Sequence, residues 1–121
     1  MSACIAWTMD LIQCFPSPLR AELQGIDLDA VRDIRLFAGK PCVVQGERGE
    51  YLTGYMPDAG ELCDLAQTLS RRMLRLSQTA GQGYLTLRNG HRMGLCGHVE
   101  EDGEGLILRE VGSVCIRVAH E

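Results

Sequence analysis

Apolar and polar residues repeat with two different periods along this chain, and the change of period separates helices from strands. Residues 3–14 carry apolar side chains around much of a helical circumference. The segment Phe15-Pro-Ser-Pro18 ends that pattern, because proline disfavours helical geometry in the residue before it. Ser17 can cap a second helix that has the following proline at its first position, runs to about Leu23 and stops at Gly25.

From residue 31 the period changes to two, which is typical of strands. Residues 31–38 show a mixed period-two pattern of the kind expected of a strand, and residues 42–45 and 50–53 form two shorter runs separated by glycine-containing turns. We therefore predict three successive strands in this part of the chain.

A longer amphipathic helix follows Asp58, with Glu61 three residues further on as its capping-box partner. Its apolar residues share one stripe at helical spacing, namely Leu62, Leu65, Ala66, Leu69, Met73 and Leu76. Three arginines, Arg71, Arg72 and Arg75, lie near its C-terminus, where positive charge suits the helix dipole. Gly81 and Gly83 are its expected end.

Residues 84–99 predict a hairpin around Asn89-Gly90, a dipeptide that accepts positive φ at both central positions of a two-residue turn. Its second run carries His91 and Arg92, then Gly94 and Gly97. Glycine weakens a strand, so Gly94 and Gly97 indicate a bulge or the close approach of another backbone or a ligand. We place the functional site on this hairpin.

Two further strands are predicted at residues 106–109 and 113–119, after a polar turn at 101–105. The order of elements predicts an α+β fold, a mainly antiparallel sheet with N-terminal helices and one longer amphipathic helix packed on it. Residues 1–121 form a single domain by length. Because the sequence stops directly after a strand, we expect one module of a longer protein or a trimmed piece of one.

Charge and composition exclude several classes of function. The net charge of −4 and a pI near 5.3 give no general affinity for nucleic acid or anionic membranes. Lys40 is the only lysine among 12 basic residues. The arginine excess suits bidentate recognition of carboxylate or phosphate, and high-GC codon usage explains it equally well.

The six cysteines predict reduced thiols in the cytoplasm. They lie mostly in apolar runs, no signal peptide opens the chain, and no Cys-x-x-Cys pair is present. We expect no metal site and no direct membrane insertion, since no apolar run has the length of a membrane span.

No complete catalytic motif is present, so we expect no catalytic residue and no cofactor in this chain. His91, Cys96 and His98 have the residue types of a metal site, but His91 should point away from the other two. A phosphate-binding loop is missing as well, so the chain should not hydrolyse nucleotide unaided.

Three arginines on predicted strands, Arg35, Arg92 and Arg117, are the candidate functional side chains. Each has apolar neighbours within an alternating run. Three alternatives stay open for them: an outward-facing, solvated position, an ion pair with Asp33 or Glu110, or a contact with a phosphate bound on a neighbouring domain.

Three segments resemble the stage III sporulation protein AA family. Residues 31–41 resemble its Glu-Glu-Ile-Arg-Leu-Arg-x-Gly-Arg-Pro signature, with Phe37 at the place of the second arginine. Residues 83–97 are similar to its block Gly-Tyr-Ile-Thr-x-x-Gly-Gly-His-Arg-Val-Gly-Leu-x-Gly. Residues 113–121 are similar to its Ser-x-x-x-Arg-Ile-Ala-x-Glu. Order and spacing agree over about residues 19–121.

The resemblance implies the N-terminal domain of a cytoplasmic secretion-type ATPase that serves the channel between mother cell and forespore. ATP and Mg²⁺ would then bind a C-terminal ATPase domain, which this sequence does not include. Partners implied are that ATPase domain, like subunits in a hexamer and membrane-associated channel proteins. By analogy with related ATPases, Arg92 and Arg117, then Arg35, would contact nucleotide phosphates.

Two other functions stay open from the sequence. One is a stand-alone adaptor that binds a protein partner through a strand edge or an arginine surface. The other is a small metal-dependent enzyme that uses His91, Cys96 and His98.

Overall fold

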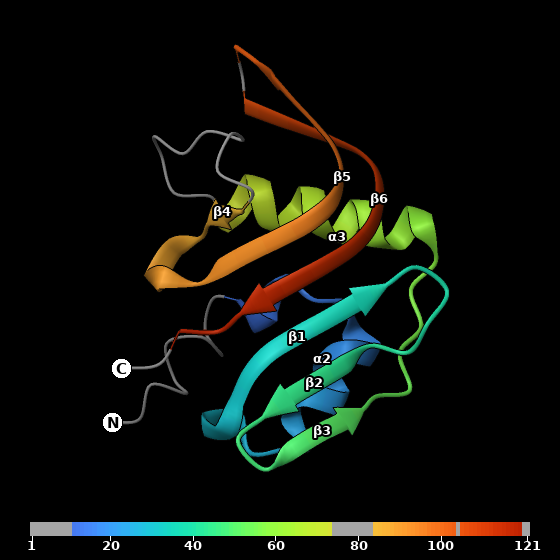
Figure 1. Ribbon diagram of the computed structural model, residues 1–121, viewed down its shortest axis with the longest axis vertical. Coiled ribbons are helices and arrows are strands. Elements are labelled where there is room, and N and C mark those ends of the chain that lie inside the picture. The colour runs from blue at the N-terminus through green and yellow to red at the C-terminus, as the bar shows by residue number, and fades with distance from the viewer. Residues whose placement is uncertain (1–10, 74–83, 104, 120–121) are drawn as a thin grey trace.

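A computed structural model describes residues 11–73, 84–103 and 105–119 of the chain. Its centre is a six-stranded antiparallel sheet with the strand order β3-β2-β1-β6-β5-β4 (Figure 1). The strands are β1 Val31–Phe37, β2 Val43–Gly46, β3 Gly49–Leu52, β4 Leu85–Thr86, β5 Arg92–Asp102 and β6 Gly105–Arg117. The α+β class predicted from the alternation of periods is confirmed.

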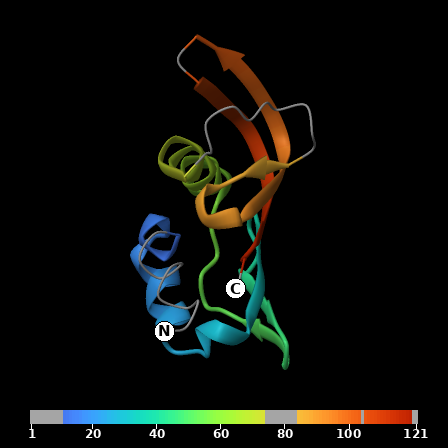
Figure 2. The same cartoon turned by 90° about the vertical axis from the view of Figure 1, so that its left-hand side faces the viewer.

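Among the described residues, the helices cover one face of this sheet and none covers the other (Figure 2). The helical elements are η1 Ile12–Cys14, α2 Ser17–Gln24, η2 Leu28–Ala30, α3 Ala59–Met73 and η4 Arg88–Gly90. Helix α3 packs against β6, and α2 lies on the same side of the sheet, where its Glu22 accepts a hydrogen bond from Tyr51 of β3 at 2.7 Å (Figures 1 and 2). The core between the helices and the sheet is aliphatic, and its largest fully buried side chains are Leu11, Ile12, Leu19, Leu23, Ile34, Leu36, Leu62, Leu69, Leu87, Met93 and Ile116.

The start of α3 is the capping box that the sequence predicted. The N–H of Glu61 donates to Asp58 Oδ1 at 2.8 Å, and the N–H of Asp58 donates to Glu61 Oε1 at 3.3 Å. These two bonds satisfy donors that a helix N-terminus otherwise leaves without a partner. The predicted continuation at Arg75 and Leu76 and the predicted end at Gly81 and Gly83 lie outside the described residues.

Helix α2 begins one residue earlier than predicted. The carbonyl of Pro16 already accepts the N–H of Arg20 at 2.9 Å, so Pro16 is the N-cap and Ser17 lies within the helix. Gly25 ends the helix as expected, with a φ of −89° rather than a left-handed one. Of the helix predicted at 3–14, residues 3–10 are outside the described chain and η1 forms part of the remainder.

The hairpin turn at Asn89-Gly90 is longer than predicted. Strands β4 and β5 are joined by the three-residue element η4, and the N–H of Leu87 donates to the carbonyl of His91 across its base at 2.7 Å. A three-residue hairpin loop places a glycine in the left-handed region at its last position, and Gly90 has a φ of +86°. The prediction of a two-residue turn was therefore wrong.

The two strands predicted at 106–109 and 113–119 are one long strand, β6. Its register with β5 shifts between Cys96 and His98, which face Ser113 and Arg109 respectively. Glu110, with a φ of 54°, lies among the extra residues of β6 at this bulge. The bulge absorbs the break in the alternating pattern without ending the strand.

Within the residues described, no helix is both long enough and apolar enough to cross a membrane.

Candidate functional site

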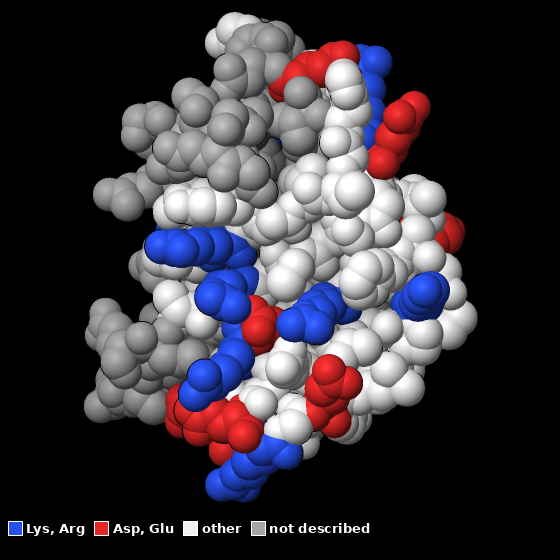
Figure 3. Space-filling view, in the orientation of Figure 1, with Lys and Arg blue, Asp and Glu red and all other residues white. Residues whose placement is uncertain are grey.

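The open face of the sheet carries all three candidate arginines. Ile34, Val114 and Ile116 are buried against the helices. Since side chains alternate between the two faces of a strand, Arg35 and Arg117 project from the other face. Arg92 is on that face too, because it pairs directly with Arg117. Figure 3 looks onto this face and shows basic side chains spread over its middle.

Arg92 and Arg117 lie directly opposite each other on the neighbouring strands β5 and β6. Side chains in such a pair have Cβ atoms about 5 Å apart, and like charges at that separation repel. Both residues are exposed to solvent. Two exposed arginines on neighbouring strands of an open surface are the residue type that recognises oxyanions.

Each arginine of this pair has a different neighbour that orients it. Asp33 lies opposite Arg117 on β1, and its Oδ1 accepts the Nε–H of Arg117 at 3.3 Å. Arg92 has its guanidinium carbon 5.1 Å from the centre of the Tyr84 ring, at cation–π distance. The Arg117 side chain is 73% exposed, so its ion pair with Asp33 stabilises the fold by only about 0–1 kcal/mol.

Arg35 lies one row further along the same face. It pairs with Cys115 of β6 on one side and with Val43 of β2 on the other. Unlike Arg92 and Arg117 it is half-buried. Of the carboxylates that the structure describes, none forms an ion pair with Arg35 or Arg92.

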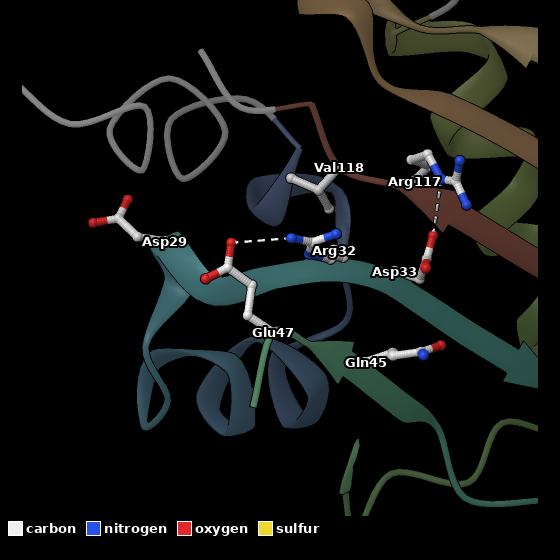
Figure 4. A pocket seen from close by; sticks show the side chains of 7 residues that line it. All are labelled: Asp29, Arg32, Asp33, Gln45, Glu47, Arg117 and Val118. Atoms are coloured by element: carbon white, nitrogen blue, oxygen red, sulfur yellow. Dashed lines mark hydrogen bonds and ion pairs between the residues drawn. The ribbon is translucent and has the colours of Figure 1, made fainter. Parts of the chain in front are cut away.

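A polar hollow of about 490 Å³ adjoins Arg117 at the end of β1 (Figure 4). Asp33 pairs with Arg117 inside it, and Glu47 pairs with Arg32 at 3.2 Å. The full lining is Asp29, Arg32, Asp33, Gln45, Glu47, Arg117 and Val118. The lining has three carboxylates, Asp29, Asp33 and Glu47, and two arginines, so the hollow itself does not favour an anion. Arg92 lies outside the hollow, beside Arg117.

His91 has a structural place in the hairpin. The residue is only 1% exposed, and its Nδ1 accepts the N–H of Ala119 at 3.0 Å. A nitrogen that accepts a backbone N–H carries no proton, so the neutral ring has its proton on Nε2. His91 thereby fixes the segment that follows β6. Gly90 also lies near Ala119, because a Cβ added to Gly90 would be 3.5 Å from Ala119 Cβ.

The two strand glycines differ in what surrounds them. A Cβ on Gly97 would lie 2.9 Å from Val111 Cα and 3.1 Å from the carbonyl oxygen of Arg109, so the bulge of β6 requires glycine there. A Cβ on Gly94 would have no atom within 4 Å. Gly97 therefore allows the backbone of β5 to lie close to that of β6 at Val111. Gly94 leaves open space on the face that carries the arginines.

The residue types of a metal site do not come together. His91 is buried, while Cys96 and His98 are exposed, and His98 Nε2 lies 3.2 Å from Glu100 Oε1. Across the described ranges, no group of three or more His, Cys, Asp or Glu side chains is placed to hold a metal ion.

One contributor to the site was missed from the sequence, Tyr84, whose ring lies beside the Arg92 guanidinium. Of the two acids expected as partners of the arginines, Asp33 pairs with Arg117. The signal for Tyr84 was its place just before the first hairpin strand, two residues from Thr86, which pairs with Arg92. No signal in the sequence gives the strand order that brings Asp33 beside Arg117.

The fold and this site define a class: a small α+β domain whose antiparallel sheet carries helices on one face and exposed arginines on the other. A family model described as "Sporulation stage III, protein AA" matches residues 11–121. The chain is also 33% identical over 96 residues to stage III sporulation protein AA of Bacillus subtilis (strain 168). That alignment covers 75% of this chain and 30% of the relative, so the chain spans well under half of the relative's length. This chain belongs to the stage III sporulation protein AA family, and the membership supports a role in sporulation.

Proposed function

We propose that this chain is a non-catalytic assembly and regulatory domain of a sporulation ATPase, N-terminal to the domain that binds nucleotide. The match to 30% of a longer relative supports this, because it leaves room in the relative for a separate ATPase domain. ATP and Mg²⁺ would bind that other domain and not this chain. The location is the cytoplasm of the mother cell, and the further partners are like subunits and the membrane-associated proteins of the sporulation channel.

The observation that carries the proposal is the direct pairing of Arg92 with Arg117 on the open face. A like-charged pair of this kind is unfavourable by itself and becomes favourable when an anion lies between the two groups. A nucleotide phosphate on an adjoining ATPase domain is such an anion. Arginines supplied from outside a nucleotide site stabilise the charge that develops during phosphoryl transfer.

Arg35 has a lesser part in this proposal. It is half-buried and one row away from Arg117, so it would contact the surface of the ATPase domain rather than the phosphates. We rank the phosphate contacts as Arg92 and Arg117 first and Arg35 third.

The test is ATP hydrolysis by the purified ATPase domain of a longer family member, alone and with this chain added. We expect the chain to raise kcat. Arg92→Ala or Arg117→Ala should lower the stimulated kcat by at least about tenfold, a threshold set below the roughly 10³-fold or more that a donated arginine contributes. Arg71→Ala is the matched control, because Arg71 is an exposed arginine on α3 behind the sheet. Equal stimulation by wild type and both variants would remove the pair from the mechanism.

A second candidate function is a protein-binding adaptor with no part in nucleotide hydrolysis. The observation that favours it is the exposure of large apolar side chains, including Phe37 and Leu52, on the same open face. An adaptor would bind its partner equally well with and without nucleotide and would leave ATP hydrolysis unchanged.

A further inference from the structure

Three apolar side chains form a second feature of the open face, at the end away from Arg92. Val43 pairs with Leu52 of β3 on one side and with Arg35 on the other, and Phe37 follows two residues after Arg35 on the same face. Leu52 is 64% exposed and Phe37 is 43% exposed. We call Phe37, Val43 and Leu52 the apolar cluster.

We propose that the apolar cluster is the docking site for an acidic amphipathic helix of a protein partner. Exposed apolar surface next to polar residues marks protein-binding sites. On the face of a sheet only side chains are offered, because the backbone groups of β1 and β2 are used in pairing with their neighbours. An element that docks there has to satisfy its own backbone, as a helix does and an extended strand does not.

The dimensions of the cluster fit one helix. It spans the three neighbouring strands β1, β2 and β3, which gives a width of about 10 Å at the usual spacing of strands. A helix with its side chains has a diameter of about 10 Å. Helices of this chain cover the opposite face in the same way (Figure 2).

Charge selects an acidic helix. Arg35 borders the cluster on β1, and Lys40 lies in the turn just beyond Phe37, where its N–H donates to the carbonyl of Phe37. In the part of the chain that the structure describes, neither basic group forms an ion pair with a carboxylate. The acids on this face are Asp33, which pairs with Arg117, and Glu50, which lies on the edge strand β3. A helix with leucine-like residues flanked by carboxylates complements both the apolar and the basic groups.

This site goes beyond the proposed contact with nucleotide and does not depend on it. Arg92 and Arg117 lie on β5 and β6, whereas the cluster lies on β1 to β3. Binding of the helix is therefore measured with no nucleotide and no ATPase domain present, and loss of ATPase stimulation leaves its outcome unaffected.

The experiment uses two synthetic helical peptides of about 15 residues with the same leucine stripe. One peptide has glutamates beside the stripe and the other has lysines. Fluorescence anisotropy measures Kd for the full chain, and amide chemical shifts locate the peptide. We expect the glutamate peptide to bind about tenfold more tightly, with shifts centred on Phe37, Val43 and Leu52.

Variants distinguish binding at the apolar cluster from nonspecific hydrophobic binding of the peptides. Arg35→Glu should remove the preference for the glutamate peptide, and Leu52→Ser should weaken binding of both peptides. Arg71→Glu, on the opposite side of the sheet, should change neither. Because Arg35 is half-buried, Lys40→Glu at an exposed turn position provides the same charge test if Arg35→Glu does not fold.

Three results would overturn the proposal. The first is equal affinity for the glutamate and lysine peptides. The second is a set of chemical shifts centred on α3 rather than on the cluster. The third is self-association of the chain in sedimentation experiments that Leu52→Ser abolishes, which would identify a second copy of the chain as the occupant.

Discussion

His91 Nδ1 accepts the backbone N–H of Ala119 at 3.0 Å, which ties the first residue after the β4–β5 loop to the segment that leaves β6. The histidine is buried, so its substitution leaves a backbone donor with no acceptor. His91→Leu should lower the free energy of unfolding by about 1–3 kcal/mol. Urea unfolding measures this change, and His98→Leu, an exposed histidine on the same hairpin, should stay within about 0.5 kcal/mol of wild type. Equal effects of the two substitutions on the free energy of unfolding would contradict the role of His91 as the acceptor for the Ala119 N–H.

The Arg92–Arg117 pair predicts a specific response to anions. Sulfate should raise the melting temperature of the isolated chain more than chloride does at equal ionic strength, because a divalent oxyanion can bridge two guanidinium groups. In Arg92→Gln the difference between the two salts should disappear, while in Arg71→Gln it should remain. Differential scanning fluorimetry provides the measurement. A sulfate effect that survives Arg92→Gln unchanged would place the anion elsewhere.

The two glycines of β5 should respond in opposite ways to alanine. Gly97→Ala places a Cβ 2.9 Å from Val111 Cα, and backbone has to move, so we expect a loss of about 1–3 kcal/mol of stability. Gly94→Ala meets open space and reduces the freedom of the unfolded chain, so it should be neutral or stabilise by up to about 1 kcal/mol. Chemical unfolding of both variants checks the pair, and similar losses in both would argue against the observed bulge.

Glu22 predicts a pH dependence of stability. Tyr51 Oη donates to its Oε2 at 2.7 Å and the N–H of Gly54 donates to its Oε1 at 3.1 Å. The hydrogen bond from Tyr51, followed by that from Gly54, holds the pKa of Glu22 below its ordinary value of 4.5. The folded state binds a proton on Glu22 less readily than the unfolded state does. The contribution of the Glu22 carboxylate to the free energy of unfolding is therefore complete above the ordinary pKa of 4.5. It is lost as the pH falls through the lowered pKa.

Glu22→Gln should therefore reduce the dependence of stability on pH between about pH 7 and about pH 3. Urea unfolding at a series of pH values measures this slope. Glu50→Gln removes the same charge from β3, at a side chain without these two bonds, and serves as the control. An unchanged acid slope in Glu22→Gln would show that the bonds to Tyr51 and Gly54 do not form in solution.

Local features of this fold could be predicted where the determinants are close in sequence. The capping box of α3 needs only Asp58 and Glu61, and the strands at β1, β2 and β3 follow from alternation over a few residues. The structure confirms these elements to within one or two residues. Arg35, Arg92 and Arg117 could be chosen from the sequence because each is a charged residue within an apolar alternation.

The remaining features depend on partners far along the chain. The close approach at Gly97 involves Val111, and the length of β6 depends on a bulge with a positive φ at Glu110, a conformation that glutamate rarely adopts. Asp33, Arg117 and Arg92 become neighbours only through the strand order β1-β6-β5. Local sequence patterns do not determine that order. The apolar cluster depends in the same way on β3 lying at the edge.

The position of β6 in the sheet has a consequence for how the molecule is made. This strand, the last of the described sheet, lies between β1 and β5 and is the element that joins the β1–β3 half to the β4–β5 half. During synthesis the two halves therefore have no shared strand until residues 105–117 have left the ribosome. Contacts of such large sequence separation form slowly, and each half exposes an unpaired strand edge while it waits. The nascent chain should thus gain its protease resistance in one late step, when β6 enters the centre of the sheet.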